Sequence, residues 1–315
     1  MPTTRRVDAL RIALYAPSDA EAWTIALERA LPQARIEPWS REAGPDADYA
    51  IVWRPLPDVL PSLRRAKAIF NLGAGVDAIP EPGAQTRAPL IRLDDAGMAE
   101  QMIEYVCHAA LRCYREVDVY AEQQRRAVWR PRPRAPKREF AIGILGAGVL
   151  GGAVAEALVR LRFPVRTWSR TRKELPDVTS FAGMAELASF LAGTRFLVCL
   201  LPLTDATRNL LDRARLSLLP RGASVVNVAR GPIVVDADLV ALLDEGHLAG
   251  AFVDVFRDEP LPPGHPFWHH PRVVVTPHVS AVTLIAESAE QIADKIRRLE
   301  AGLPVAGVVD RVFGY

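Results

Sequence analysis

Short apolar runs alternate with polar and helix-patterned stretches through the first third of the chain. The runs cover residues 11–16, 36–39, 49–53, 68–72 and 90–93. Runs of this length are typical of buried strands, and strands that alternate with helices are typical of a parallel sheet. The pattern therefore predicts an α/β domain with a doubly wound, flavodoxin-like sheet.

A second alternation predicts a second doubly wound parallel sheet, of the Rossmann type. Its apolar runs cover residues 140–145, 165–169, 196–201, 224–228, 251–255 and 273–276. Helical spacing of apolar residues predicts one long helix over 97–124 and another over 284–301, which returns the chain to the first domain. We therefore expect a discontinuous domain of residues 1–100 and 286–315, and an inserted domain of residues 101–285.

Composition limits the class of protein. The chain has 315 residues, half of them hydrophobic, and a formal net charge of +2, as expected for two globular domains with a cleft and not for a general nucleic-acid binder. The basic, proline-containing run 125–138 is expected to be a solvated boundary loop that can touch a partner subunit. Three cysteines in apolar stretches and no apolar run near about 18 residues predict a cytoplasmic protein without disulfides or membrane contact.

A glycine motif, Gly146-Ala-Gly148-Val-Leu-Gly151, follows the run 140–145 and opens a helical stretch. Gly146 permits a tight turn, Gly148 lets a pyrophosphate approach the backbone, and Gly151 allows the helix to pack closely on the strand. Val149 and Leu150 would present backbone N–H groups at the helix N-terminus to the phosphates. The motif therefore assigns dinucleotide binding to the inserted domain.

The strand after this motif bears on which dinucleotide binds. It ends in Ser169-Arg170-Thr171-Arg172, where an NAD site usually has an acidic residue. Ser169 can hydrogen-bond a 2′-phosphate, and Arg170 can pair with it and stack on adenine. These residues favour NADPH over NADH, although a plain solvent-facing strand end, with weak cofactor preference, is the alternative.

Arg230, Glu259 and His278 each follow a short apolar run. Strand ends could therefore deliver a cation, an acid and an imidazole to one cleft. A guanidinium can grip the carboxylate of a 2-keto acid, and a protonated imidazole can give a proton to the carbonyl oxygen. A nearby carboxylate favours the protonated imidazole. We expect these three residues to be catalytic.

With these motifs in this order, the chain resembles the D-2-hydroxyacid dehydrogenase family, and more narrowly its glyoxylate/hydroxypyruvate reductase A group. The supporting segments are 71–77, 97–102, 143–151, 168–173, 254–262 and 271–278. The resemblance implies hydride transfer from nicotinamide C4 to C2 of a 2-keto acid. His278 would donate the proton, Glu259 would orient the imidazole, and Arg230 would bind the substrate. A homodimer built through the cofactor domain and the Trp129 loop is also implied.

The resemblance implies further contacts with the substrate and the cofactor. Backbone N–H groups of Ala74 and Gly75 would bind the substrate carboxylate; the alternative is that this loop is a plain turn after a strand. Trp53 and Arg54 could wall the substrate pocket or merely pack. Asp254 resembles the partner of the nicotinamide carboxamide. The remaining expected cofactor contacts are Pro202, Thr207, Val228, Ala229, Arg230, His278 and Ser280.

The sequence leaves the substrate open within these limits. NADPH-dependent reduction of glyoxylate to glycolate and of hydroxypyruvate to D-glycerate is expected; a reductase of bulkier keto acids such as phenylpyruvate, or a non-catalytic dinucleotide sensor, is the alternative. Three clustered histidines, His265, His269 and His270, lack a cysteine or carboxylate at ligand spacing, so no metal site is expected.

Overall fold

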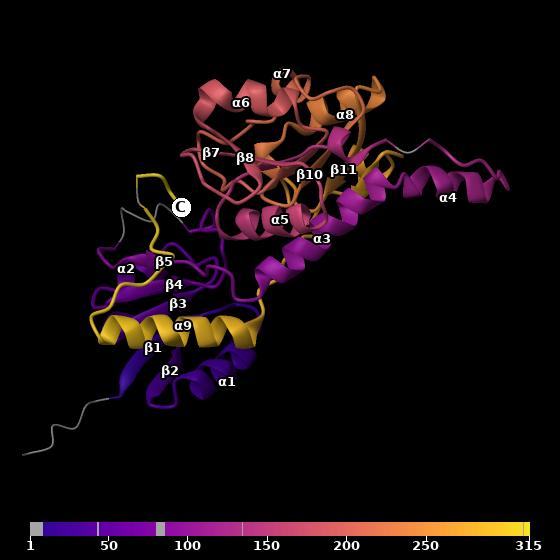
Figure 1. The fold of residues 1–315 in the computed structure, drawn as a ribbon. Coiled ribbons are helices and arrows are strands. Elements are labelled where there is room, and N and C mark those ends of the chain that lie inside the picture. Colours follow the sequence, from indigo (N-terminus) through magenta and orange to yellow (C-terminus); the bar gives the residue numbers. More distant parts are fainter. Residues whose placement is uncertain (1–8, 43, 80–85, 134, 311) are drawn as a thin grey trace, which may run out of the picture. The chain divides into compact units, whose positions relative to one another are not determined.

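The computed structural model describes residues 9–42, 44–79, 86–133, 135–310 and 312–315. The chain divides into two compact units, Met1–Gly97 with Thr283–Tyr315 and Met98–Val282. Each unit has its own parallel sheet, so the predicted fold class of two parallel-sheet α/β domains is confirmed (Figure 1). The assignment of the first unit to substrate and of the second to the dinucleotide stays a prediction.

The first unit contains, within the described residues, a five-stranded sheet in the order β2-β1-β3-β4-β5, the flavodoxin-like order. Its strands are β1 Leu10–Tyr15, β2 Ala34–Pro38, β3 Tyr49–Val52, β4 Ala68–Asn71 and β5 Leu90–Ile91. Its helices are α1 Ala20–Ala30, α2 Val59–Ser62, α9 Ile285–Glu300 and the short η1 Gly44–Asp46. Helices α1 and α9 pack together beside the sheet, and Arg297 of α9 donates a hydrogen bond to the carbonyl oxygen of Ala30 (3.0 Å) (Figure 1).

The second unit contains, in its described part, a seven-stranded sheet in the order β12-β11-β10-β9-β6-β7-β8. Its strands are β6 Ile142–Leu145, β7 Val165–Ser169, β8 Val178–Ala182, β9 Phe196–Cys199, β10 Ala223–Asn227, β11 Leu248–Val253 and β12 Val273–Val275. Its helices are α3 Met98–Tyr114, α4 Val117–Arg125, α5 Val149–Arg160, α6 Gly183–Ala192, α7 Arg213–Leu216 and α8 Asp236–Asp244, with short turns η2 Lys137–Glu139, η3 Gly231–Ile233 and η4 Pro266–Trp268. The order is that of the Rossmann fold with one further strand beyond β11.

Helices cover both faces of this sheet, and successive side chains of a strand point to opposite faces, so each central strand contributes to two buried clusters. On β9, Phe196 and Val198 join the cluster that packs under α3 and α5, whereas Leu197 and Cys199 join the cluster under α6 and α8. Because all the strands are parallel, their carboxyl ends lie at one edge of the sheet, between the two helical layers.

The structure corrects the prediction of one helix over 97–124. Helix α3 ends at Tyr114, and Glu116 adopts a left-handed conformation (φ +52°) before α4 begins at Val117. Helix α3 buries Met102 and Val106 along one face, whereas α4 has no buried residue. The helical spacing continues past Tyr114, but the packing that supports α3 stops there.

Strand β8 was not predicted, since its residues are only partly buried and form no apolar run. It lies at the edge of the sheet and pairs with β7 alone. Across the described residues, no helix is long and apolar enough to cross a membrane.

A buried ion pair in the first unit generates a stability prediction. Lys295 is 5% exposed, and its Nζ donates to Asp94 (2.8 Å) and to the carbonyl oxygen of Arg92 (2.9 Å). Lys295→Met leaves the Asp94 carboxylate with only its longer ion pair to Arg92 (3.6 Å), and it should lower the free energy of unfolding by roughly 3 kcal/mol. In urea denaturation the control Lys67→Met, which removes an exposed partner of Glu300, should cost under about 1 kcal/mol. An equal loss in both variants would contradict this role for Lys295.

Candidate active site

The glycine motif forms the turn between β6 and α5. Gly146 has φ +102°, and a Cβ there would lie 2.6 Å from the carbonyl oxygen of Leu200; a Cβ at Gly151 would lie 1.8 Å from the carbonyl oxygen of Gly146. A Cβ at Gly148, by contrast, would meet no atom within 4 Å. Gly148 also caps α5 without a side chain, so the first N–H groups of the helix, at Val149 and its neighbours, have no side-chain cap. The turn therefore fits an anionic ligand such as a pyrophosphate.

The end of β7 carries the residues expected to select the cofactor. Arg170, Thr171 and Arg172 are exposed. Arg172 forms an ion pair with Glu186 of α6 (2.5 Å) and donates to the carbonyl oxygen of Ser180. The hydroxyl of Ser169 donates to the carbonyl oxygen of Thr171 (2.8 Å), which occupies its only hydrogen. Arg172 is thus engaged within the protein, and Ser169 must release Thr171 before it can donate to a phosphate.

Two polar side chains shape the loops after β9 and β10. Thr207 donates to the carbonyl oxygen of Pro202 (2.7 Å) and closes the loop that follows β9. Asn227 accepts from the N–H of Ala229 (3.2 Å) and donates to the carbonyl oxygen of Arg230 (3.1 Å). The turn after β10 is therefore held by Asn227, which the sequence analysis did not single out.

Arg230 lies half-buried at the end of β10, immediately after the buried residues Val228 and Ala229. Its Nη1 donates to the carbonyl oxygen of Ala229 (2.6 Å), which fixes the guanidinium at this strand end. A Cβ at the next residue, Gly231, would lie 1.9 Å from the backbone carbon of Phe256. Glycine at this position lets the turn after β10 approach the segment after β11.

Asp254 is fully buried at the end of β11 and holds the segment that follows β12. Its carboxylate accepts hydrogen bonds from the Thr276 hydroxyl (2.6 Å), the Val279 N–H (2.9 Å) and the Ser280 N–H (2.9 Å). Because the single hydrogen of the Thr276 hydroxyl is used, Tyr105 of α3 must donate the 2.7 Å bond between the two hydroxyls. Burial raises the pKa of Tyr105, which keeps this donor protonated.

His278 lies in the middle of this segment in a left-handed conformation (φ +55°). Its N–H donates to the carbonyl oxygen of Asp254 (2.8 Å). A non-glycine residue with this conformation is uncommon and persists only where its surroundings fix it. The bonds made by Asp254 on both sides of His278 supply that constraint.

His278 and Glu259 form a direct pair. The Nδ1 atom of His278 lies 2.8 Å from Oε2 of Glu259, whose other oxygen accepts from the Phe256 N–H (3.0 Å). The imidazole is 40% exposed and the carboxylate 27% exposed. With a carboxylate at Nδ1, the proton resides on that nitrogen and Nε2 is left for exchange with a ligand.

In the first unit, the side chain of Asn71 stabilises the loop after β4 through hydrogen bonds. Its side-chain amide donates to the carbonyl oxygens of Gly73 (3.0 Å) and Gly75 (2.8 Å). Because a trans peptide directs its N–H opposite to its carbonyl, the Ala74 N–H points away from Asn71. Asn71 ends a strand of otherwise apolar residues; it belongs to the motif 71–77, but no role was predicted for its side chain.

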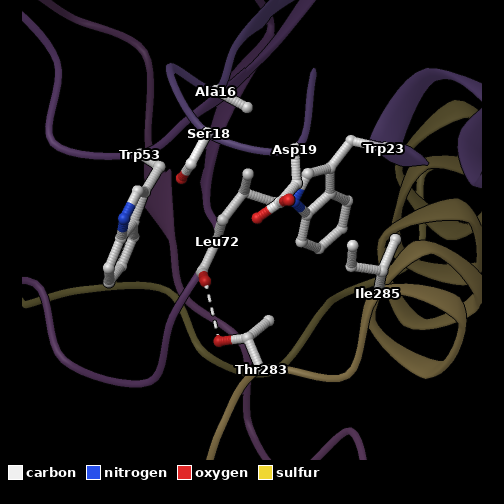
Figure 2. A pocket seen from close by; sticks show the side chains of 8 residues that line it. All are labelled: Ala16, Ser18, Asp19, Trp23, Trp53, Leu72, Thr283 and Ile285. Atoms are coloured by element: carbon white, nitrogen blue, oxygen red, sulfur yellow. Dashed lines mark hydrogen bonds between the residues drawn. The ribbon is translucent and has the colours of Figure 1, made fainter. Parts of the chain in front are cut away.

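Trp53 and Arg54 follow β3 in the same unit. A Cβ at Gly73 would lie 2.7 Å from the Trp53 ring, so the indole rests directly on the loop after β4. The Arg54 guanidinium lies 5.5 Å from the centre of the Trp53 ring. Trp53 also walls a pocket of about 160 Å³ (Figure 2). Its other lining residues are Ala16, Ser18, Asp19, Trp23, Leu72, Thr283 and Ile285.

The structure thus brings Gly146, Ser169, Pro202, Arg230, Asp254 and His278 to the carboxyl edge of one parallel sheet. Trp53, Arg54, Ala74 and Gly75 follow two adjacent strands of the other sheet. In the described part of the chain, no three His, Cys, Asp or Glu side chains group as a metal site. Burial raises the pKa of Cys113 to about 11 and that of Cys199 to about 12, so neither thiol is a nucleophile near neutral pH.

The Rossmann strand order and the open glycine turn define a dinucleotide-binding α/β protein. A sequence model of the D-isomer specific 2-hydroxyacid dehydrogenase NAD binding domain matches residues 107–280, more than half of the chain. The chain belongs to the D-isomer specific 2-hydroxyacid dehydrogenase family and is an oxidoreductase, which confirms the resemblance read from its motifs.

Crystal structures of relatives agree with the fold over nearly the whole chain. A D-isomer specific 2-hydroxyacid dehydrogenase from Xanthobacter autotrophicus Py2, in complex with NADPH and MES, is 39% identical over 98% of this chain and 100% of its own (TM-score 0.91). An NADPH-dependent glyoxylate/hydroxypyruvate reductase from Sinorhizobium meliloti, in complex with NADP and sulfate, is 33% identical over 97% of this chain and 100% of its own (TM-score 0.87). A probable 2-hydroxyacid dehydrogenase from Rhizobium etli CFN 42, in complex with NADP, HEPES and L(+)-tartaric acid, is 32% identical with the same coverage (TM-score 0.91).

The Asp254 contacts predict the effect of a small change. Asp254→Asn keeps the size but turns one acceptor into a donor that faces an N–H or a hydroxyl, which should lower the free energy of unfolding by roughly 2 kcal/mol. Hydrogen exchange of the Val279 and Ser280 amides should accelerate. The control Asp258→Asn, at an exposed neighbouring position, should change neither quantity. Unchanged protection of the two amides in Asp254→Asn would show that the carboxylate does not hold this segment.

Proposed function

We propose that the chain reduces small 2-keto acids to D-2-hydroxy acids with NADPH as the preferred donor: glyoxylate to glycolate and hydroxypyruvate to D-glycerate. The observation that carries the proposal is the 2.8 Å pair between His278 Nδ1 and Glu259 Oε2 at the carboxyl edge of a Rossmann sheet. Relatives described as NADPH or NADP complexes, one of them a glyoxylate/hydroxypyruvate reductase, support the cofactor and the substrate class.

Proton transfer is the task of His278. The contact between Glu259 and Nδ1 orients the imidazole and leaves Nε2 to face the ligand. As C2 is reduced, the Nε2–H bond breaks and the proton passes to the carbonyl oxygen, which leaves a neutral imidazole still bonded to Glu259. Arg230 binds the substrate carboxylate and polarises the carbonyl through its guanidinium.

The residues after β6 and β7 fit NADPH. When bound, the nicotinamide supplies the hydride that C2 accepts. The uncapped N–H groups at the start of α5 suit the pyrophosphate, and the absence of a side chain at Gly148 lets it approach. Arg170 is exposed where a 2′-phosphate would be recognised, with Ser169 and Thr171 beside it. Asp254 contributes mainly by holding Ser280 and the His278 turn.

The loop after β4 fits the substrate carboxylate. Asn71 donates to the carbonyl oxygen of Gly73, so the Ala74 N–H of the same peptide points away from Asn71. A main-chain donor of this kind, with Gly75 beside it, needs small residues so that the ligand can reach the backbone. We assign the carboxylate of the keto acid to these N–H groups.

A homodimer is part of the proposal. The Trp129 side chain is 99% exposed, Val128 is 43% exposed, and α4 buries none of its residues within the chain. An apolar surface of this kind on a separate helix and loop is typical of a subunit interface.

The role of His278 predicts a kinetic outcome. His278→Asn removes the proton donor, and asparagine tolerates the left-handed conformation; kcat with glyoxylate should fall by about 100-fold or more. The exposed His269→Asn should leave kcat unchanged. NADPH affinity, measured by fluorescence titration, should stay within about threefold of the wild type in both variants, because neither change removes a phosphate contact. A His278→Asn enzyme with wild-type kcat would refute the role.

The wild-type assay also separates the alternatives. NADPH oxidation should be fast with glyoxylate and hydroxypyruvate and slower with phenylpyruvate. Turnover of phenylpyruvate alone would indicate a reductase of bulkier keto acids. No turnover with any of the three would favour a non-catalytic dinucleotide sensor.

The cofactor preference makes a separate prediction. Arg170→Ala removes a charge-assisted bond to the 2′-phosphate and should raise KM for NADPH about tenfold while changing KM for NADH little. Lys173→Ala removes the same charge from a neighbouring exposed position and serves as the control. If Arg170→Ala raised KM equally for NADPH and NADH, Arg170 would not recognise the 2′-phosphate.

A further inference from the structure

The pocket walled by Trp53 lies at the carboxyl ends of β1, β3 and β4 of the first unit, where ligands bind in open α/β sheets (Figure 2). Leu72 lines this pocket and directly precedes the Gly73–Gly75 loop. The indole of Trp53 rests on Gly73, so pocket and loop share a wall. A molecule whose carboxylate is held at Ala74 therefore has the pocket close by.

Asp19 gives this pocket its charge. It is the N-cap residue of α1, a position where an Asp side chain ordinarily accepts a backbone N–H of the first turn. Here Asp19 has φ +59° and makes no such bond. Figure 2 shows its carboxylate and the Ser18 hydroxyl between the rings of Trp53 and Trp23. Both residues are exposed, and among the described residues neither of these two polar groups has a hydrogen-bond partner within the protein, so a ligand in the pocket can reach both.

We propose that this pocket is the subsite for the C3 substituent of the substrate, and that Asp19 and Ser18 select substituents that carry a hydroxyl and reject those that carry a carboxylate. The proposal rests on the proposed function and names its substrate class, 3-hydroxylated 2-keto acids. Nothing in the reaction step itself changes, because the pocket acts on the far end of the molecule.

The physical reasons are charge and size. A carboxylate accepts a strong hydrogen bond from a hydroxyl, and the hydroxyl of Ser18 can donate or accept as needed. A second carboxylate on the substrate would instead face the negative charge of Asp19, and two like charges at short range repel each other. A volume of about 160 Å³ accepts a hydroxymethyl group easily.

Glyoxylate is the internal reference, since it has no C3 and cannot enter the subsite. In Asp19→Asn, the kcat/KM ratio of hydroxypyruvate to glyoxylate should fall about fivefold, because a neutral acceptor binds a hydroxyl less strongly. The ratio of oxaloacetate to glyoxylate should rise. Glu21→Gln removes an exposed carboxylate two residues away and should change neither ratio. An Asp19→Asn enzyme in which all three substrates change equally, or none changes, would overturn the proposal.

Binding measurements separate this inference from the proposed function. Calorimetry in the presence of NADP should give tighter binding of D-glycerate than of glycolate to the wild type, and Asp19→Asn should reduce that difference. If the wild type reduces no keto acid, the proposed function fails, and calorimetry alone decides the subsite. Equal affinity for the two hydroxy acids in the wild type overturns it.

Discussion

One buried carboxylate organises the second unit around its candidate proton donor. Asp254 ends β11 and accepts three hydrogen bonds from the segment after β12, two of them from backbone N–H groups on the far side of His278. A fully buried carboxylate that lost these donors would be costly, so the segment has little freedom to move away. The left-handed conformation of His278, its reach to Glu259, and the bond from Tyr105 through Thr276 all depend on this arrangement.

The strands were predictable where both faces of a sheet are buried. A central parallel strand needs a largely apolar run, and β9, whose four residues Phe196–Cys199 are all apolar and buried, shows it directly. Edge strand β8 has no such run, because solvent replaces one neighbour and its side chains are only partly buried. The break between α3 and α4 escaped prediction for a related reason: helical periodicity persists locally, while the buried surface that supports the helix ends at Tyr114.

The sequence predicted which residue types of the candidate site lie at strand ends. It did not predict most of the contacts that these residues make. Glycine requirements at Gly146 and Gly151 follow from backbone approach and were readable from the motif. The engagement of Arg172 by Glu186 joins β7 to α6 and has no local signature. Asn71 and Asn227 hold their turns through side-chain amides, and each is a polar residue at the end of a mainly apolar strand. Such a residue indicates a strand end whose turn is stabilised by a side-chain hydrogen bond. It does not indicate which backbone groups accept or donate that bond.

Chemistry and substrate choice are assigned to different parts of the chain. The proposed proton donor is fixed by contacts that lie wholly within the second unit, from Asp254, Glu259 and Thr276. The proposed C3 subsite is lined wholly by residues of the first unit. A change at Asp19 or Ser18 can therefore alter the charge that meets the far end of a substrate while every bond around His278 stays in place. Substrate range can then vary in this family without a matching change in the groups that move the proton.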